Sequence, residues 1–169
     1  VTEGNIGSAR IIKMLNVVDD ALVVESNGIY SIENYLTSRR LMYWQVYLHK
    51  TTVGCENVLI NALHRAKALA AKGTELFASP ALRYFLYNDV DANSFQSDEK
   101  ALDNYIELDD NDIWSALKVW QHHDDKILSL LASNIVNRRL FKVEVREEEP
   151  TEEEIQALKA SLSATYGIE

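Results

Sequence analysis

Four side chains between residues 39 and 50 are of types that bind anions, and their spacing places them on one helical face. Arg39, Tyr43, Tyr47 and Lys50 follow one another at steps of four, four and three residues, which share a face of an α-helix. Arginine offers a planar fork of donors and lysine a point charge, while tyrosine offers a hydroxyl and a flat ring. Phosphate is the anion that these groups fit best. The spacing alone also allows a second interpretation, an amphipathic helix whose long cations extend over its apolar face.

The stretch that carries these residues, 31–71, predicts one long helix. Its apolar residues recur at steps of three and four, it contains no proline, and its only glycine is Gly54. Ser31 suits an N-cap, and Gly73 suits the residue just past the end of the helix. An unbroken helix would run about 40 residues, or roughly 60 Å at 1.5 Å per residue. We expect a bend near Gly54 that leaves two helices of ordinary length.

The residues before this helix predict a small β-hairpin. Asn27-Gly28 is a strong turn signal, and it would join a short strand at 22–24 to a returning strand at 29–30. Two further segments precede the hairpin, a loop at 1–4 and a helix at 8–15 whose inward residues would be Ile11, Ile12 and Leu15.

The residues after the long helix predict shorter helices with recognisable start signals. Ser79-Pro80 suits an N-cap followed by proline at the first helical position, and Thr151 with Glu154 forms a capping box. A polar loop at 88–99 would lead to residues 101–108, which allow either a short helix or an extended connection, and we expect a helix at 100–106. We expect Asp110 or Asn111 to cap a helix that ends at Gln121, with these residues buried: Ile113, Trp114, Leu117 and Trp120. We expect Asp124 or Asp125 to cap the helix that follows, with these residues facing inward: Ile127, Leu128, Leu131 and Ile135.

The predicted fold class is therefore mainly α, with a small β-hairpin. Residues 140–145 alternate apolar and polar side chains and predict a strand, and the capped helix at 151 follows it. A strand followed by a helix predicts the start of a C-terminal α+β lobe. We accordingly expect two domains, a helical part at 1–139 and the start of this lobe at 140–169.

Composition limits the classes of protein to which the chain can belong. It has 169 residues, 47% hydrophobic and 25% charged, which is ordinary for a soluble globular protein. The net charge of −9 argues against a general nucleic-acid footprint. Cys55 is the only cysteine, so there is no disulfide framework or cysteine-rich zinc site, and a reducing compartment, the cytoplasm, is the simplest expectation. No apolar run approaches the length of a membrane span, and no signal peptide opens the chain.

Three segments together resemble a known family. IYSIENYLTSRRLMYWQVYLHKTTVGCENVLINAL resembles the long helix that follows the metal site in HD-domain phosphohydrolases, and is most similar to the deoxynucleotide triphosphohydrolase branch. GNIGSARIIKMLNVVDDALVVESNGIYS resembles the helix and short extended pair before that helix, and LDDNDIWSALKVWQHHDDKILSLLASNIVNRRLFKV resembles a later segment. The resemblance covers most of residues 4–145, and its fairly specific parts are 39–50 and NRRLFKV.

The resemblance implies roles for residues of the long helix. Arg39 matches the family's arginine that contacts the substrate triphosphate, and Tyr47 matches a tyrosine near the nucleotide's sugar. Lys50 lies one turn further on and would assist. The chain departs from the family at Leu48, where the nucleotide enzyme has glutamine, and at Tyr43, which replaces a more polar residue. The predicted substrate-binding residues are therefore Arg39, Tyr43, Tyr47 and Lys50, with base and sugar preference left open.

The family's metal ligands, a histidine, a later His-Asp pair and a distant aspartate, have no counterpart in an appropriate context here. The segment His122-His123-Asp124-Asp125 contains the letters His-Asp, but KILSLL follows it instead of the family's segment with glycine, histidine and proline. We therefore predict a helix-joining turn with caps there, no metal site and no catalytic residue in the chain. The resemblance implies a fragment of a longer enzyme, with the divalent metal held by the missing part.

Two hypotheses about function follow. In the first, the chain is part of a metal-dependent phosphohydrolase for nucleotides or other phosphate esters, and its helices supply one side of the substrate pocket and an oligomer interface. In the second, it is a non-catalytic helical module for binding or self-association. Both predict a homo-oligomer, and neither involves a membrane or nucleic acid.

Overall fold

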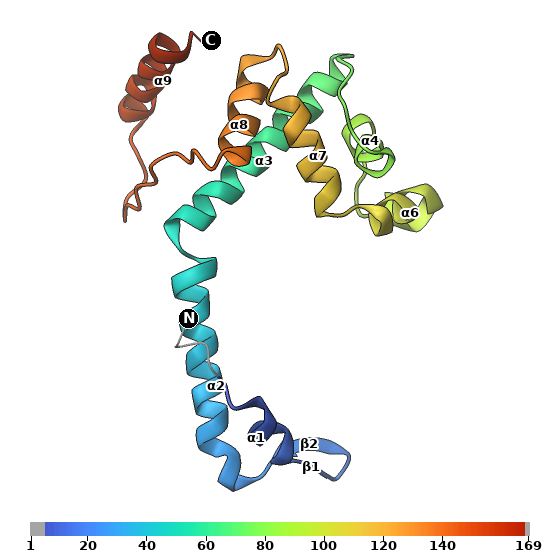
Figure 1. Cartoon of the computed structure of the whole chain (residues 1–169), viewed down its shortest axis with the longest axis vertical. Helices are drawn as coiled ribbons and strands as arrows, with labels where there is room; N and C mark the ends of the chain where they lie inside the picture. The colour runs from blue at the N-terminus through green and yellow to red at the C-terminus, as the bar shows by residue number, and fades with distance from the viewer. Residues whose placement is uncertain (1–5, 168–169) are drawn as a thin grey trace. The chain divides into compact units, whose positions relative to one another are not determined.

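The structure, a computed structural model, describes residues 6–167, so the loop predicted at 1–4 lies outside the described residues. The chain folds as two compact units, one ending at Val53 and the other beginning at Gly54. The elements of the first unit are drawn in blue to cyan in Figure 1. They are α1 (Ser8–Lys13), β1 (Leu15–Val18), β2 (Ala21–Val24), the short 3₁₀ turn η2 (Ser26–Gly28), α2 (Ile29–Met42) and the π-helical turn η3 (Tyr43–Tyr47), followed by the start of α3 (Lys50–Ala71).

The β-hairpin exists, but its position differs from the prediction. β1 pairs antiparallel with β2, from Leu15 opposite Val24 to Val18 opposite Ala21. The turn is Asp19-Asp20, with φ of 50° and 60°, the left-handed values that a two-residue hairpin turn requires and that aspartate tolerates. The predicted turn at Asn27-Gly28 was wrong, because these residues form η2 and lead directly into α2.

The helix predicted at 8–15 is shorter than expected. It ends at Lys13, and Leu15 already belongs to β1. Ile12 is 66% exposed rather than inward. The spacing of apolar residues therefore predicted the position of α1 correctly. It did not predict where the helix ends, because the residues from Leu15 onward pair as a strand.

The long helix is interrupted earlier than predicted. It begins at Ile29 instead of Ser31, with no side-chain cap at its first turn. The break comes after η3, at Leu48 and His49, and α3 then continues to Ala71. The Thr52 hydroxyl donates to the Val46 carbonyl at 2.9 Å across this break. The helix ends as predicted at Gly73, whose φ is +86°.

Gly54 is not a bend but a point of close packing inside α3. A Cβ at this position would lie 2.4 Å from Cγ2 of Val143, closer than any real contact. Glycine therefore permits the segment around Val143 to lie against the helix.

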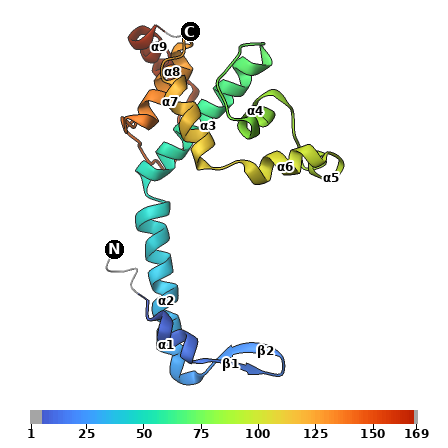
Figure 2. The same ribbon diagram turned by 45° about the vertical axis from the view of Figure 1, so that its right-hand side comes forward.

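The second unit contains α3 from Gly54 onward and a set of shorter helices (Figure 2). Several start signals are confirmed. The Ser79 hydroxyl accepts from Leu82 N, and Thr151 and Glu154 form the capping box. The cap before α7 is Asp109, so the predicted caps Asp110 and Asn111 were wrong by one or two residues. The elements are α4 (Pro80–Tyr87), α5 (Ser94–Ser97), α6 (Glu99–Glu107), α7 (Asp110–Trp120), α8 (Lys126–Val136) and α9 (Glu152–Tyr166).

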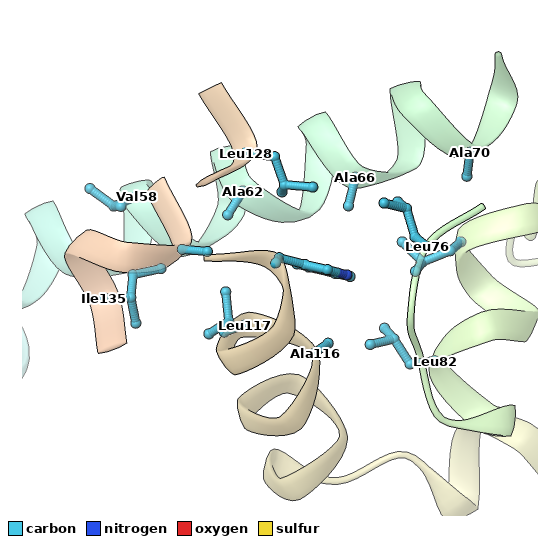
Figure 3. Packing of buried hydrophobic residues seen from close by; sticks show 13 residues of the cluster. Val58, Ala62, Ala66, Ala70, Leu76, Leu82, Ala116, Leu117, Leu128 and Ile135 are labelled. Atoms are coloured by element: carbon cyan, nitrogen blue, oxygen red, sulfur yellow. The ribbon is translucent and has the colours of Figure 1, made fainter. Parts of the chain in front are cut away.

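The hydrophobic core of the second unit lies between one face of α3 and helices α4, α7 and α8. Small residues on α3 allow this close approach, and Figure 3 shows Ala62 and Ala66 directed at Leu117 and Leu128. Trp120 is 1% exposed, and its indole N–H donates to the Phe77 carbonyl at 2.9 Å. Of the predicted α7 core, Leu117 and Trp120 are buried, Ile113 is partly buried, and Trp114 is 46% exposed.

The C-terminal part lacks the predicted strand. Residues 140–145 form neither helix nor strand among the described residues, because no neighbouring strand pairs with them. α9 follows as predicted. The mainly helical class with a small antiparallel hairpin is confirmed, while the division into domains at residue 139 stays a prediction.

Candidate functional site

Arg39 on α2 and Tyr43 and Tyr47 in η3, three of the four predicted anion-binding residues, border a pocket in the first unit. Its volume is about 310 Å³. All of its lining residues except Ile6 belong to α2 and η3, so one nearly continuous helical segment positions the polar groups. The side chains that line it are Ile6, Tyr35, Ser38, Arg39, Met42, Tyr43 and Tyr47.

Arg39 is held between two tyrosines. Its Nη1 donates to Tyr35 Oη at 3.5 Å, a long hydrogen bond, and its guanidinium carbon lies 5.7 Å from the ring centroid of Tyr43. The hydrogen bond to Tyr35, followed by that to Tyr43, raises the pKa of Arg39 above its ordinary value. The guanidinium is thus a permanent cation whose direction is set by aromatic neighbours while its surface stays exposed to solvent.

Tyr43 and Tyr47 face each other at the end of the pocket. Their ring centroids are 5.2 Å apart, the rings are inclined at 52°, and the two residues are 45% and 54% exposed. They bound a π-helical turn, in which Leu48 N donates to the Tyr43 carbonyl at 2.7 Å. Such turns occur frequently at functional sites. Two exposed phenols beside a fixed guanidinium form a surface suited to a phosphate and an attached planar or sugar group.

Lys50 is not among the residues that line the pocket. The helix breaks before it, and it is the first residue of α3. The structure therefore brings together Arg39, Tyr43 and Tyr47, and the assignment of Lys50 stays a prediction.

Sequence reasoning missed two polar members of the pocket. Tyr35 lies four residues before Arg39, so it extends the same ladder of steps of four and could have been found by counting backward. Ser38 is 4% exposed, one of the few buried polar residues among those described. No spacing signal distinguishes it from a surface serine.

The His122–Asp125 segment is a helix-joining turn, as predicted. Asp125 caps α8 by accepting from Leu128 N at 2.8 Å, and it accepts two hydrogen bonds from Arg65, at 2.6 and 3.1 Å. His123 Nδ1 accepts from the backbone N–H of Asp125 at 2.9 Å. Between residues 6 and 167 no group of three or more histidine, cysteine, aspartate or glutamate side chains is arranged to hold a metal ion.

Residues 6–79 match the family model of the HD associated region. Every side chain that lines the pocket falls within the residues that match this model.

Two longer proteins are similar to the chain. Uncharacterized protein YwfO of Bacillus subtilis (strain 168) is 32% identical over 142 residues, which are 84% of this chain and 31% of that protein. The crystal structure of a phosphohydrolase from Bacteroides thetaiotaomicron VPI-5482 matches with a TM-score of 0.94 and 61% identity, over 99% of this chain and 42% of that one. The chain thus spans less than half the length of either.

These findings support the predicted relationship to HD-superfamily phosphohydrolases. Among the described residues, every helix is too short or too polar to reach across a lipid bilayer.

Proposed function

We propose that this chain is part of a metal-dependent HD-superfamily phosphohydrolase that acts on nucleotides, of the deoxynucleotide triphosphohydrolase type. In this proposal its HD associated region forms one side of the substrate pocket. The observation that carries the proposal is the placement of Arg39 between Tyr35 and Tyr43 in a pocket of that region. The similarity to a phosphohydrolase over 99% of the chain supports it.

Each pocket residue has a role in this proposal. Arg39 binds phosphate oxygens through its planar fork of donors, an arrangement with charge and geometry suited to a polyphosphate. Tyr47 contacts the sugar, and Tyr43 supports both through its ring contacts with Arg39 and Tyr47. Lys50 would assist from the start of α3. These residues bind and orient substrate, and none of them is assigned to the bond-breaking step.

The divalent metal that such an enzyme requires does not fit the residues described here, since they offer no set of converging ligands. We therefore assign no catalytic step to this chain. In the proposal the ligands belong to the remainder of a longer protein, which is consistent with relatives more than twice as long. A cytoplasmic location would suit a nucleotide substrate.

A second candidate function is a non-catalytic module for self-association. Between residues 6 and 53 the only buried residues are Gly28 and Ser38, and large apolar side chains of the hairpin, α2 and η3 are exposed, including Leu22 at 71% and Trp44 at 63%. Apolar surface of this extent is typical of an interface. Both candidates therefore include a homo-oligomer.

A substrate panel distinguishes the two candidates. The full-length protein should be incubated with Mn²⁺ or Mg²⁺ and with deoxynucleoside triphosphates, ribonucleoside triphosphates and simple phosphate monoesters. The proposal expects release of nucleoside and inorganic tripolyphosphate from at least one deoxynucleoside triphosphate. Turnover of monoesters alone would contradict the nucleotide assignment, and absence of turnover across the panel would favour the self-association module.

A further inference from the structure

Tyr35 lines the pocket of the first unit, but the proposed function gives it no contact with the substrate. It lies one helical turn before Arg39 on the same face of α2. Tyr35 is partly buried and Arg39 is exposed, so the tyrosine is the better covered member of the pair. Two adjacent turns of one helix therefore bring both side chains to the same pocket.

The partner that holds Arg39 is an uncharged one. Nη1 of Arg39 donates to Tyr35 Oη at 3.5 Å, and within residues 6–167 no carboxylate forms an ion pair with Arg39. Arg65, by contrast, pairs with Asp125 at 2.6 Å. A carboxylate would neutralise the guanidinium and compete with an incoming anion. A phenol accepts a hydrogen bond from the guanidinium and leaves its positive charge uncompensated.

The Tyr35 hydroxyl still has its own hydrogen to donate. A phenol accepts through the lone pairs of its oxygen and donates one hydrogen, whereas arginine has donors and no acceptor. The hydrogen therefore cannot go to Arg39, and no oxygen or nitrogen atom of the described part of the chain accepts it. Because Tyr35 lines the pocket, an anion bound there is able to accept this hydrogen.

Tyr35 and Arg39 together offer an anion two kinds of donor at one place. Nη1 of Arg39 and Oη of Tyr35 are 3.5 Å apart, so different oxygens of one phosphate group can accept from both. Hydrogen bonds to an ionised acceptor are shorter and stronger than those between neutral groups. The contact with Tyr35 also orients the guanidinium before the substrate binds, and a side chain that is already oriented loses less rotamer freedom on binding.

We propose that Tyr35 is a further substrate-binding residue, which orients Arg39 and donates its hydroxyl hydrogen to the phosphate group that Arg39 binds. This inference rests on the proposed function, because it requires that phosphate binds in this pocket. It adds that the pocket recognises phosphate through a pair of side chains on adjacent turns of α2, and that the phenol hydroxyl is the part of Tyr35 that matters.

Calorimetric titration of the full-length protein with inorganic tripolyphosphate tests this inference. Tyr35→Phe removes the hydroxyl and keeps the ring. We expect it to raise the Kd for tripolyphosphate about tenfold or more, because a hydrogen bond to a charged acceptor is lost. Tyr30→Phe is the matched control and should leave this Kd unchanged, because Tyr30 also lies on α2, is 79% exposed and does not line the pocket. Both variants should keep the melting temperature of the wild type.

A double-mutant cycle with Arg39→Ala separates this inference from the proposed function. Arg39→Ala should weaken tripolyphosphate binding, and Tyr35→Phe should add little in that background, because the two residues act on one phosphate group. If Arg39→Ala weakens binding and Tyr35→Phe does not, the inference is overturned while the proposed function stands. If neither variant changes the Kd, both are overturned. Equal effects of Tyr35→Phe in the two backgrounds would show that Tyr35 acts without Arg39, which also overturns the inference.

Discussion

At the scale of single residues, Asp125 shows how one carboxylate can serve two elements. It caps α8 through Leu128 N and pairs with Arg65 on α3. The Arg65 hydrogen bond, with help from the Leu128 backbone, lowers the pKa of Asp125 despite its partial burial. The residue therefore stabilises the packing of α3 against α8, and no metal is needed to explain its neighbourhood.

The first prediction concerns this contact and its pH dependence. Because the folded pKa is below the unfolded one, the stabilisation is fully present above the ordinary aspartate pKa of about 3.9 and is lost as pH falls through the folded value. Asp125→Ala should lower the free energy of unfolding by about 1–3 kcal/mol at neutral pH. Asp125→Asn keeps a capping oxygen and should cost less.

Denaturant unfolding at neutral pH and at low pH measures both effects. The difference between wild type and Asp125→Asn should begin to shrink as pH falls below the ordinary aspartate pKa of about 3.9, and it should disappear once pH is below the lowered pKa of the folded carboxyl. Asp124→Asn is the matched control, because Asp124 is the adjacent residue and its side chain is exposed. This variant should change the free energy of unfolding little. A difference for Asp125→Asn that does not depend on pH would show that the ion pair with Arg65 contributes nothing.

At the scale of elements, several start and stop signals in the sequence are confirmed, whereas a contact between residues far apart in the chain leaves no local signal. The starts at Ser79-Pro80 and Thr151 and the stop at Gly73 depend on side chains within a few residues, so the sequence contained them. Gly54 was interpreted as a bend because glycine is a poor helix former. Its actual reason is Val143, 89 positions later in the chain, and no local pattern reveals such a contact.

The hairpin and the pocket show the same limit. Asn27-Gly28 is the stronger turn signal by residue type, yet the turn forms at Asp19-Asp20 because the apolar runs on either side pair there. The steps of four in the sequence predicted three residues that line the pocket, Arg39, Tyr43 and Tyr47. The prediction of Lys50 requires a helix that continues through Leu48 and His49, where the structure interrupts it.

The second prediction tests the role of Gly54. Alanine has the higher helix propensity by about 1 kcal/mol, but its Cβ would collide with Val143. Gly54→Ala should therefore fail to stabilise the wild-type chain, while in a Val143→Ala background it should stabilise by up to about 1 kcal/mol. Chemical denaturation of the four members of this double-mutant cycle gives the coupling. Equal effects in both backgrounds would mean that residue 143 does not touch α3.

At the scale of the whole molecule, the chain matches less than half the length of the proteins it resembles. The third prediction is that the 169-residue chain alone has no metal-dependent hydrolase activity, because its described residues offer no metal-binding group. Incubation with Mn²⁺ or Mg²⁺ and a nucleotide panel should give no turnover above buffer. Turnover that His123→Ala abolishes would reassign the 122–125 turn as a metal site.

The central claim is that Arg39 binds substrate phosphate, and kinetics of the full-length protein test it most directly. Arg39→Ala should lower kcat/KM for the nucleotide about 10- to 100-fold through loss of a charge-assisted contact. Arg39→Lys should recover only part, since it lacks the two-pronged geometry. Arg40→Ala is the control, because Arg40 lies over the ring of Trp44 outside the pocket.

Melting curves accompany these kinetics. We expect reduced kcat/KM for both Arg39 variants, near-normal kcat/KM for Arg40→Ala, and little change in melting temperature for any of them, because exposed cations contribute little to stability. Normal kinetics for Arg39→Ala, together with a melting temperature several degrees lower, would make Arg39 a packing residue and contradict the claim.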